Sequence, residues 1–228
     1  MDEKPRESSK SLLSSISPII EKKIDVVLKR SIRWITMFLF ILINMTMMID
    51  TGLFSSASTK IKEALIIDDK KFGLFGSCNH CGRILGTIIF MFIFNLFNRK
   101  NLLLIALYLN SLSIFVFTIT SIVPILFIAR IMNGFCATFG FIYFPIWIDQ
   151  FGIQAKKTVM MSLIQMASPL GMVLGYTINT FLGSNRWKIT LLIESICLFC
   201  FVSIIILIPK KYFSKKLCFK QHFDGVES

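Results

Sequence analysis

The stretch "FLFILINMTMMI", residues 38–49, decides the fold class of this chain. It is a continuous apolar run, as is "GTIIFMFIFNLF" at residues 86–97. Neither run shows the alternation of apolar and polar residues, over about ten residues, that is typical of a membrane barrel strand. A helix that crosses a bilayer needs about 20 mainly apolar residues. The sequence therefore predicts an all-α membrane protein.

The composition supports this interpretation. Hydrophobic residues make up 54 % of the 228 residues, and the mean hydropathy is +0.70. An average soluble domain has about 45–50 % apolar residues. We expect a transmembrane domain over residues 34–208 with tails at 1–33 and 209–228, and no removable signal peptide is apparent before it. The six expected spans are Trp34–Ser55, Phe72–Phe97, Leu102–Thr120, Pro124–Ile148, Thr158–Phe181 and Trp187–Ile208.

The basic residues predict the orientation. Of the 25 Lys and Arg residues, 17 lie in the two tails and in the segments 98–101 and 155–157, whereas six lie on the opposite side. The positive-inside rule therefore places both termini in the cytosol. The net charge of +12 lies mostly at span ends, where anionic lipid headgroups are the nearest partners, so we expect no nucleic-acid partner.

The N-terminal tail divides into two parts. Residues 1–16 are rich in Ser, Lys and Glu and are expected to be disordered. The stretch "SPIIEKKIDVVLKRSIRW" begins at residue 17 and mixes apolar with charged residues. It predicts an amphipathic helix at the membrane surface, and we favour an anchoring role over a regulatory one.

The spans form an internal repeat. Residues 34–120 and 124–208 each contain three expected spans, and the second of each three contains a Gly-x-x-x-Gly, "GRILG" at Gly82–Gly86 and "GMVLG" at Gly171–Gly175. Small residues four apart allow helix backbones to approach closely. Because each unit has an odd number of spans, the two units are inverted relative to one another, which predicts a 3+3 inverted repeat.

Six stretches carry a family resemblance. They are "NMTMMIDTG" from residue 44, "NRKNLLL" from 98, "ARIMNGFCA" from 129, "FPIWIDQFG" from 144, "SPLGMVLGY" from 168 and "NRWK" from 185. In this order, the run from Asp50 to Trp187 resembles the N-terminal six-helix half of a major facilitator superfamily transporter, and its details resemble the spinster-like branch.

The resemblance implies a function and a partner. It implies a secondary transporter, in half or truncated form, that moves a small organic solute or a lysolipid-like amphiphile by alternating access. It also implies a second six-helix bundle, either a C-terminal half or another copy of the chain. The second and fifth helices border the other half in this family, so Gly82 and Gly171 are expected to pack at that border. The alternative is a six-helix membrane protein that binds or scaffolds without transporting.

The chain departs from the family pattern in three places. In the first helix, Thr51 follows Asp50 at the position where spinster-like members usually carry an Arg. The cytosolic loop signature normally has a Gly, an Asp-Arg pair and two basic residues, and only Arg99 and Lys100 remain of it here. These two residues are therefore the candidates for gating. In the fourth helix, Cys136 occupies the position at which spinster-like members usually carry a Glu. The resemblance thus implies no proton coupling through that position.

Two charges inside spans are expected to pair. Arg130 lies six residues inside the fourth span and Asp50 five residues from the end of the first, which places both about 8–9 Å from the same membrane face at 1.5 Å per residue. In the family that this chain resembles, both helices line the central cavity. An unpaired charge in hydrocarbon costs at least about 2.5–3.5 kcal/mol, which favours pairing or a watery cavity.

Further polar residues inside spans complete the candidate site for substrate binding or ion coupling. Arg83 and Glu194 are the other two charges, and Asn79 and His80 lie on the same helix as Arg83. The sequence leaves open whether Arg83 pairs with Glu194, with Asp50 or with neither. It also leaves open that Glu194 snorkels toward the membrane surface or is protonated.

The remaining motifs indicate no catalytic chemistry. The "CNHC" at 78–81 supplies too few ligands for zinc, so we expect no metal and no cofactor. No nucleophile–base set, phosphate loop or catalytic carboxylate pair lies in a soluble segment, so we expect no enzyme. Pro145 and Pro169 each remove a helix hydrogen bond and predict kinks, which act as hinges or as static packing features.

Overall fold

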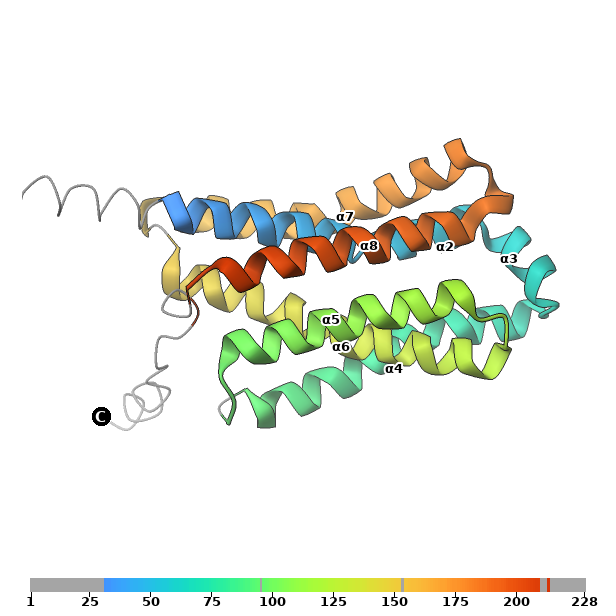
Figure 1. The fold of residues 1–228 in the computed structure, drawn as a ribbon, viewed down its shortest axis with the longest axis horizontal. Coiled ribbons are helices and arrows are strands. Elements are labelled where there is room, and N and C mark those ends of the chain that lie inside the picture. Colours follow the sequence, from blue (N-terminus) through green and yellow to red (C-terminus); the bar gives the residue numbers. More distant parts are fainter. Residues whose placement is uncertain (1–30, 95, 153, 210–212, 214–228) are drawn as a thin grey trace, which may run out of the picture.

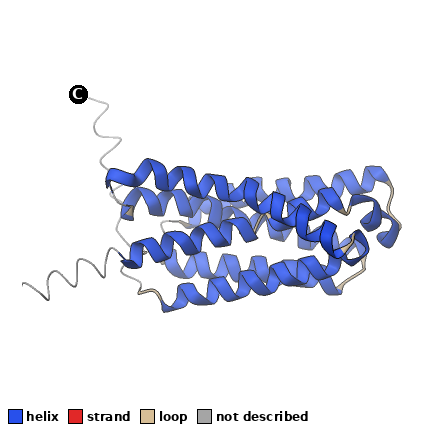
Figure 2. Cartoon of the chain, turned by 90° about the horizontal axis from the view of Figure 1, so that it is seen from above, coloured by secondary structure: helices blue, strands red, loops and turns tan. Residues whose placement is uncertain are grey.

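The computed structural model describes residues 31–94, 96–152, 154–209 and 213. All regular structure in these residues is helical (Figure 2). Residues 1–30 lie outside the described part of the chain. They include nearly all of the N-terminal tail and most of the amphipathic helix predicted from residue 17. Most of the C-terminal tail lies outside the described part as well.

The first membrane-crossing segment is interrupted. A helix over residues 31–46 ends at a turn formed by Met47 and Met48, and α2 (Ile49–Ser56) follows. The helix α3 (Ser58–Leu65) comes next, in the connection between the first and second expected spans. The apolar run therefore fixes the length of the first segment but does not reveal its internal turn.

Five long helices follow. They are α4 (Asp69–Ile93), α5 (Arg99–Ile119), α6 (Val123–Phe151), α7 (Lys157–Leu182) and α8 (Trp187–Leu207). The short 3-10 helices η1 (Gln154–Lys156) and η2 (Ser184–Arg186) precede α7 and α8. Pro124 lies in the first turn of α6, where its missing N–H leaves no helix hydrogen bond unmade. Most ends lie within about four residues of the predicted ones.

Five helices have the length and apolar composition needed to cross a membrane. These are Ser31–Ser56, Arg99–Ile119, Val123–Phe151, Lys157–Leu182 and Trp187–Leu207 within the described residues. The predicted span Phe72–Phe97 corresponds to α4, which is 25 residues long but is not among the five. Asn79, His80 and Arg83 lower the hydropathy of α4, although the helix lies lengthwise in the same bundle (Figure 1).

The helices pack as a single bundle. The first helix and α2 lie against α7, α4 lies against α6, and α5 contacts both α6 and α8. Pro145 lies inside α6 and Pro169 inside α7, and each helix continues past its proline without a break.

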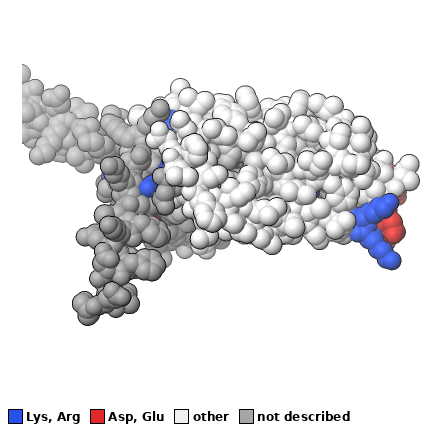
Figure 3. Space-filling model, turned by 90° about the horizontal axis from the view of Figure 1, so that it is seen from below, with Lys and Arg blue, Asp and Glu red and all other residues white. Residues whose placement is uncertain are grey.

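Charged side chains gather at the ends of the bundle. Figure 3 shows an uncharged surface along the length of the molecule, with a cluster of acidic and basic residues at one end. At that end, Lys60 pairs with Glu63 at 2.8 Å and Lys62 with Asp69 at 2.6 Å. The uncharged belt is rich in exposed large apolar side chains on α4, α5, α7 and α8, as expected of helices that face lipid or another helix bundle.

Candidate functional site

A buried ion pair joins the first membrane-crossing segment to α6. Arg130 donates from Nη1 to Asp50 Oδ2, and their side chains are only 7 % and 1 % exposed. Asn133, about one turn further along α6, donates from Nδ2 to the same Asp50 oxygen at 3.4 Å. Thr51 donates its hydroxyl to the other carboxylate oxygen at 3.1 Å. The pair that the matched depths predict is therefore present, and its role in function remains a proposal.

The helix ends and aromatic rings around the pair stabilise its charges. Asp50 lies in the first turn of α2, where the unpaired N–H groups of the helix favour a negative charge. The guanidinium carbon of Arg130 lies 3.9 Å from the ring centroid of Phe54 and 5.5 Å from that of Phe75. Cation–π attraction thus adds to the ion pair on the side that these rings cover.

A second carboxylate belongs to the same charged region. Glu194 on α8 is completely buried, and neither of its oxygens has a hydrogen-bond partner among the described residues. Asp50 and Arg130 are the charged side chains that interact with it electrostatically. Arg130 Nε likewise has no partner in the described part of the chain. The ion pair and Glu194 therefore form one group of interacting charges with unused hydrogen-bonding capacity.

A small void adjoins this group. It has about 10 Å³ of accessible space and is lined by Asp50, Arg130, Asn133, Ser113 and Leu191, among others. That space is about what a single water molecule requires. The charged group is thus packed tightly enough to exclude any ligand larger than water.

Arg83 lies apart from the ion pair. Its Nε donates to Asn79 Oδ1 at 3.1 Å, and its guanidinium carbon lies 5.2 Å from the ring centroid of Phe141. It interacts electrostatically with Asp50 but forms no ion pair with a carboxylate of the described residues. Of the alternatives that the sequence left open, the structure thus shows direct pairing with neither acid. Asn79 is buried, whereas His80 lies on the exposed side of α4.

An apolar groove opens between α4, α6 and the start of α7. Its volume is about 680 Å³, and its residues are Thr87, Phe90, Met91, Phe94, Ile142, Pro145, Ile146, Asp149, Gln150 and Met161. Asp149, at its polar end, forms an ion pair with Lys157. Gln150 Oε1 accepts a hydrogen bond from Arg99 Nη1 at 3.1 Å. The groove is thus apolar along its walls and polar at one end.

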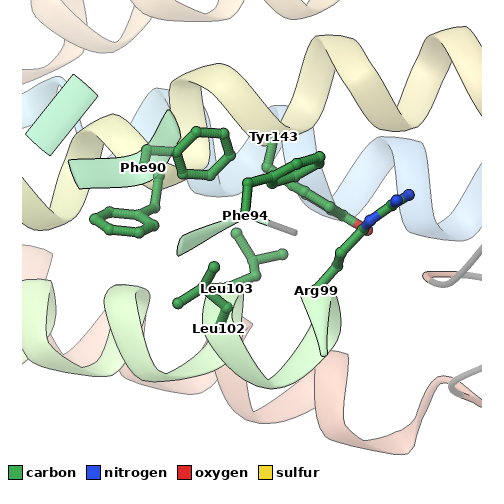
Figure 4. Close-up of a pocket in the computed structure, with 7 residues that line it drawn as sticks. Phe90, Phe94, Arg99, Leu102, Leu103 and Tyr143 are labelled. Carbon is green, nitrogen blue, oxygen red and sulfur yellow. The ribbon is translucent and has the colours of Figure 1, made fainter. Parts of the chain in front are cut away.

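A neighbouring depression is closed by aromatic packing. Figure 4 shows the rings of Phe90, Phe94 and Tyr143 together with Arg99 and two leucines of α5. The guanidinium carbon of Arg99 lies 4.9 Å from the ring centroid of Phe94. The space between these side chains does not admit a water-sized molecule. This depression therefore contributes to packing and not to ligand binding.

Lys100, the second gating candidate, caps a helix. Its Nζ donates to the carbonyl oxygens of Ile206 at 2.9 Å and Ile208 at 2.5 Å, at the end of α8. Its Nζ also lies 5.5 Å from the ring centroid of Phe213, whose carbonyl oxygen accepts from the Tyr143 hydroxyl. A cation at a helix C-terminus satisfies carbonyl groups that the helix leaves unpaired. Lys100 therefore holds the end of α8 against the bundle.

The glycines correct one expectation. A Cβ at Gly82 would lie 2.1 Å from the carbonyl oxygen of Ile131 on α6, and a Cβ at Gly171 would lie 2.1 Å from that of Met45 on the first helix. A Cβ at Gly86 would lie 2.7 Å from the carbonyl oxygen of Phe135 on α6, and a Cβ at Gly175 would lie 2.0 Å from that of Ile49 on α2. The prediction that these glycines pack at the border of a second bundle is wrong, because their faces are already filled by helices of the same chain.

The sequence decides the family. Residues 37–218, most of the chain, match the profile of the Major Facilitator Superfamily. This chain belongs to that superfamily. Its apolar helices are accordingly those of an integral, multi-pass membrane protein.

Solved transporters share the fold. The structure superposes on the inward-open xylose transporter XylE from E. coli with a TM-score of 0.68 at 20 % identity, covering 77 % of this chain and 48 % of XylE. It also superposes on the proton:xylose symporter XylE bound to 6-bromo-6-deoxy-D-glucose with a TM-score of 0.64 at 20 % identity, covering 79 % and 45 %. The chain thus spans about half the length of these transporters. Comparison with curated protein sequences finds no match.

Three neighbours of the site were not predicted from the sequence. Asn133 supports Asp50 and lies within the quoted stretch "ARIMNGFCA", where its residue type alone does not distinguish it from a packing residue. Phe54 and Phe75 are two of 23 phenylalanines, so their place over Arg130 is visible only in three dimensions. The spacing of Arg130 and Asn133, i and i+3 on one helix, is the signal that could have identified Asn133.

Proposed function

We propose that this chain is one six-helix half of a secondary transporter that works by alternating access. In this proposal α4 is the second of six spans, because it is long enough to cross a bilayer and runs with the others (Figure 1). The polar residues of α4 face a neighbouring helix or an aqueous path, as ionisable residues inside membrane segments usually do.

The glycine contacts support a 3+3 inverted repeat. The second helix of the first three, α4, packs through Gly82 on Ile131 of α6, which is the first helix of the second three. The second helix of the second three, α7, packs through Gly171 on Met45 of the first helix. The two contacts are equivalent when the two units are exchanged. In each, a Cβ added to the glycine would lie 2.1 Å from the carbonyl oxygen of the facing residue. Such exchange is what an inverted repeat requires.

The buried charged group is the observation that carries the transport proposal. Asp50, Arg130 and Glu194 lie in a bundle of otherwise apolar membrane-length helices, and a structural role alone would be served by apolar residues at lower cost. Because the group has two carboxylates and only one cation, it can take up a proton or a cation. We assign to this group the coupling of substrate movement to an ion.

The outer face of α7 supports the presence of a second bundle. Of the five apolar helices, α7 is the least buried, and Leu170, Val173 and Tyr176 are exposed on it. The superposition on about half of XylE is in keeping with a second six-helix bundle on this side. We propose that further sequence or another copy of the chain supplies that bundle.

Orientation, branch and cargo are parts of the same proposal. We place both termini in the cytosol, because Lys100, Lys156 and Lys157 lie at the end of the bundle that also holds Trp34, 5.9 Å from Lys156 Nζ. The stretches quoted from the sequence support a place near the spinster-like branch. The cargo is a small organic solute or a lysolipid-like amphiphile.

Uptake into vesicles tests the proposal. The purified chain is reconstituted and offered labelled solutes, including xylose under a proton gradient because XylE is a proton:xylose symporter. From samples that contain two six-helix bundles per particle, we expect uptake of at least one solute that Asp50→Asn abolishes and that Lys60→Met, at the outer end, leaves unchanged. Uptake that is equal in the wild type and in Asp50→Asn would contradict the assigned role of the charged group.

A further inference from the structure

Arg83 is a cation inside the membrane-spanning bundle without a carboxylate in contact. Asp50 is held by Arg130, and Glu194 interacts with Asp50 and Arg130. Arg83 uses Nε on Asn79, and its two Nη groups have no partner among the described residues. An unpaired charge in the bilayer interior costs several kcal/mol on many scales, so this position favours an anionic partner or water.

The position of Arg83 is fixed by its neighbours. Gly82, the preceding residue, is pressed against the Ile131 carbonyl, and the Thr138 hydroxyl donates to the carbonyl oxygen of Arg83 at 3.3 Å. Asn79 holds one side of the guanidinium group and the Phe141 ring covers another. The remaining Nη donors form the fork that binds carboxylate or phosphate groups in two parallel hydrogen bonds.

The groove begins one helical turn from Arg83. On α4, Thr87 follows Arg83 by one turn and is the first groove residue, and on α6 the groove begins at Ile142, next to Phe141. From Thr87 the groove follows α4 for about 10 Å to Phe94, at 1.5 Å per residue. Arg83 is not itself a lining residue of the groove; it precedes the groove on α4 by one turn and lies about 15 Å from the end of that helix. The volume of the groove, about 680 Å³, is typical of a small-molecule site.

We propose that Arg83 and this groove form a binding site for an amphiphilic organic anion. The anionic group, a carboxylate or a phosphate monoester, pairs with the Nη groups of Arg83. The apolar body of the ligand lies between Phe90 on α4 and Ile146 on α6, and extends toward Asp149. This inference rests on the proposed function in one respect, which is that such a ligand would be the cargo.

A pair of photoreactive probes tests the charge requirement. The full chain, reconstituted in phosphatidylcholine nanodiscs, is labelled with a diazirine fatty acid and with the fatty alcohol of the same chain, and the labelled peptides are mapped by mass spectrometry. We expect the acid to label the groove segments of α4 and α6 about tenfold more than the alcohol, which is the usual worth of a charge-assisted hydrogen bond. Equal labelling by acid and alcohol would overturn the proposal.

Variants at Arg83 assign the preference to that residue. In Arg83→Gln the preference for the acid should disappear, whereas Arg83→Lys, which keeps the charge, should retain part of it. Both variants are compared at equal folded fraction, measured by gel filtration, and Arg83→Lys provides the reading if Arg83→Gln does not fold. An unchanged preference in Arg83→Gln, or a complete loss in a folded Arg83→Lys, contradicts the role of Arg83 as the charged partner.

Two adjacent residues of α4 provide a matched test of the groove. Met91 lines the groove and Phe92 does not, yet their side chains are similarly exposed, at 71 % and 72 %. Met91→Trp should reduce labelling by the acid several-fold and Phe92→Trp should leave it unchanged. Equal effects, or a crosslink from position 91 to a helix of another copy, would show that a helix and not an anion occupies the groove.

The outcome is independent of transport. Labelling that shows the acid preference, in a sample that contains two six-helix bundles per particle but takes up no solute, would support the anion site and contradict the proposed function. Uptake that depends on Asp50, without any acid preference at the groove, would support the proposed function and overturn the anion site.

Discussion

Arg130 on α6 holds the carboxylate of Asp50 on α2, although the two residues are 80 positions apart in the sequence. The contact connects the first helix of one predicted repeat unit to the first helix of the other. Asn133 and Thr51 donate hydrogen bonds to the carboxylate, and the Phe54 ring lies against the guanidinium group. Each of the two charges therefore has a further neighbour that stabilises it. The pair therefore joins the first membrane-crossing segment to α6 inside the bundle.

A double-mutant cycle measures this pair. Asp50→Asn and Arg130→Gln should each lower the free energy of unfolding by about 3–5 kcal/mol, because each leaves an opposite charge buried without its partner. The double variant should be less destabilised than the sum of the two, by about 1 kcal/mol or more. Unfolding in mixed micelles, followed by circular dichroism, gives the four values.

The Lys60–Glu63 pair is the control for this cycle. Its side chains are exposed at the end of the bundle, so the same cycle there should give a coupling energy below about 1 kcal/mol. Strict additivity at Asp50 and Arg130 would mean that the contact does not contribute as an ion pair.

Glu194 should respond differently from Asp50. Its oxygens have no hydrogen-bond partner in the described part of the chain, so Glu194→Gln removes a buried acid without breaking a hydrogen bond. We expect the folded yield and the unfolding midpoint of Glu194→Gln to equal or exceed those of the wild type, while ion-coupled uptake falls. A loss of stability as large as that of Asp50→Asn would show that Glu194 has a structural partner.

The glycine contacts predict a sharp positional difference. Gly82→Leu should prevent folding of the bundle, because even a Cβ would lie 2.1 Å from the backbone oxygen of Ile131. Gly76→Leu, on the same helix, should be tolerated, because no heavy atom lies within 4 Å of its Cβ position. The measurement is the monodisperse fraction in gel filtration. Equal yields of the two variants would contradict the close approach of α4 and α6.

Lys100 should contribute to stability through α8. Lys100→Met removes two hydrogen bonds to the end of that helix and should lower the free energy of unfolding by about 1.5–3 kcal/mol. Lys71→Met, which alters an exposed lysine near the start of α4, serves as the control and should change it by less than about 0.5 kcal/mol. Thermal unfolding in detergent distinguishes the two, and similar midpoints would contradict the capping role.

The apolar runs and the spacing of glycines predicted much of the architecture. Helix positions follow from run length, and the Asp50–Arg130 contact follows from equal depths on two helices. The interruption at Met47 and Met48 could not be predicted, because that turn contains no glycine or proline and depends on tertiary packing. The partner of the glycine faces was predicted wrongly, since a Gly-x-x-x-Gly states that a helix packs closely but not which helix it contacts.

Polar neighbours were the least predictable part of the site. Asn79 and Arg83 were singled out together because both are polar in one span, and the structure joins them at 3.1 Å. His80, chosen by the same reasoning, lies on the exposed side, since adjacent helical residues point about 100° apart. The groove combines residues of three helices, none of them unusual in sequence, so only the fold shows that they line one space.

Assembly and uptake, measured on the same sample, test the central claim most directly. The 228-residue chain is reconstituted, its mass in the membrane is determined by native mass spectrometry, and solute uptake is recorded from the same vesicles. The account predicts uptake only in samples that contain two six-helix bundles per particle, and no uptake from single copies. Uptake by a demonstrably monomeric chain, unaffected by Asp50→Asn, would contradict both the half-transporter architecture and the role given to the charged group.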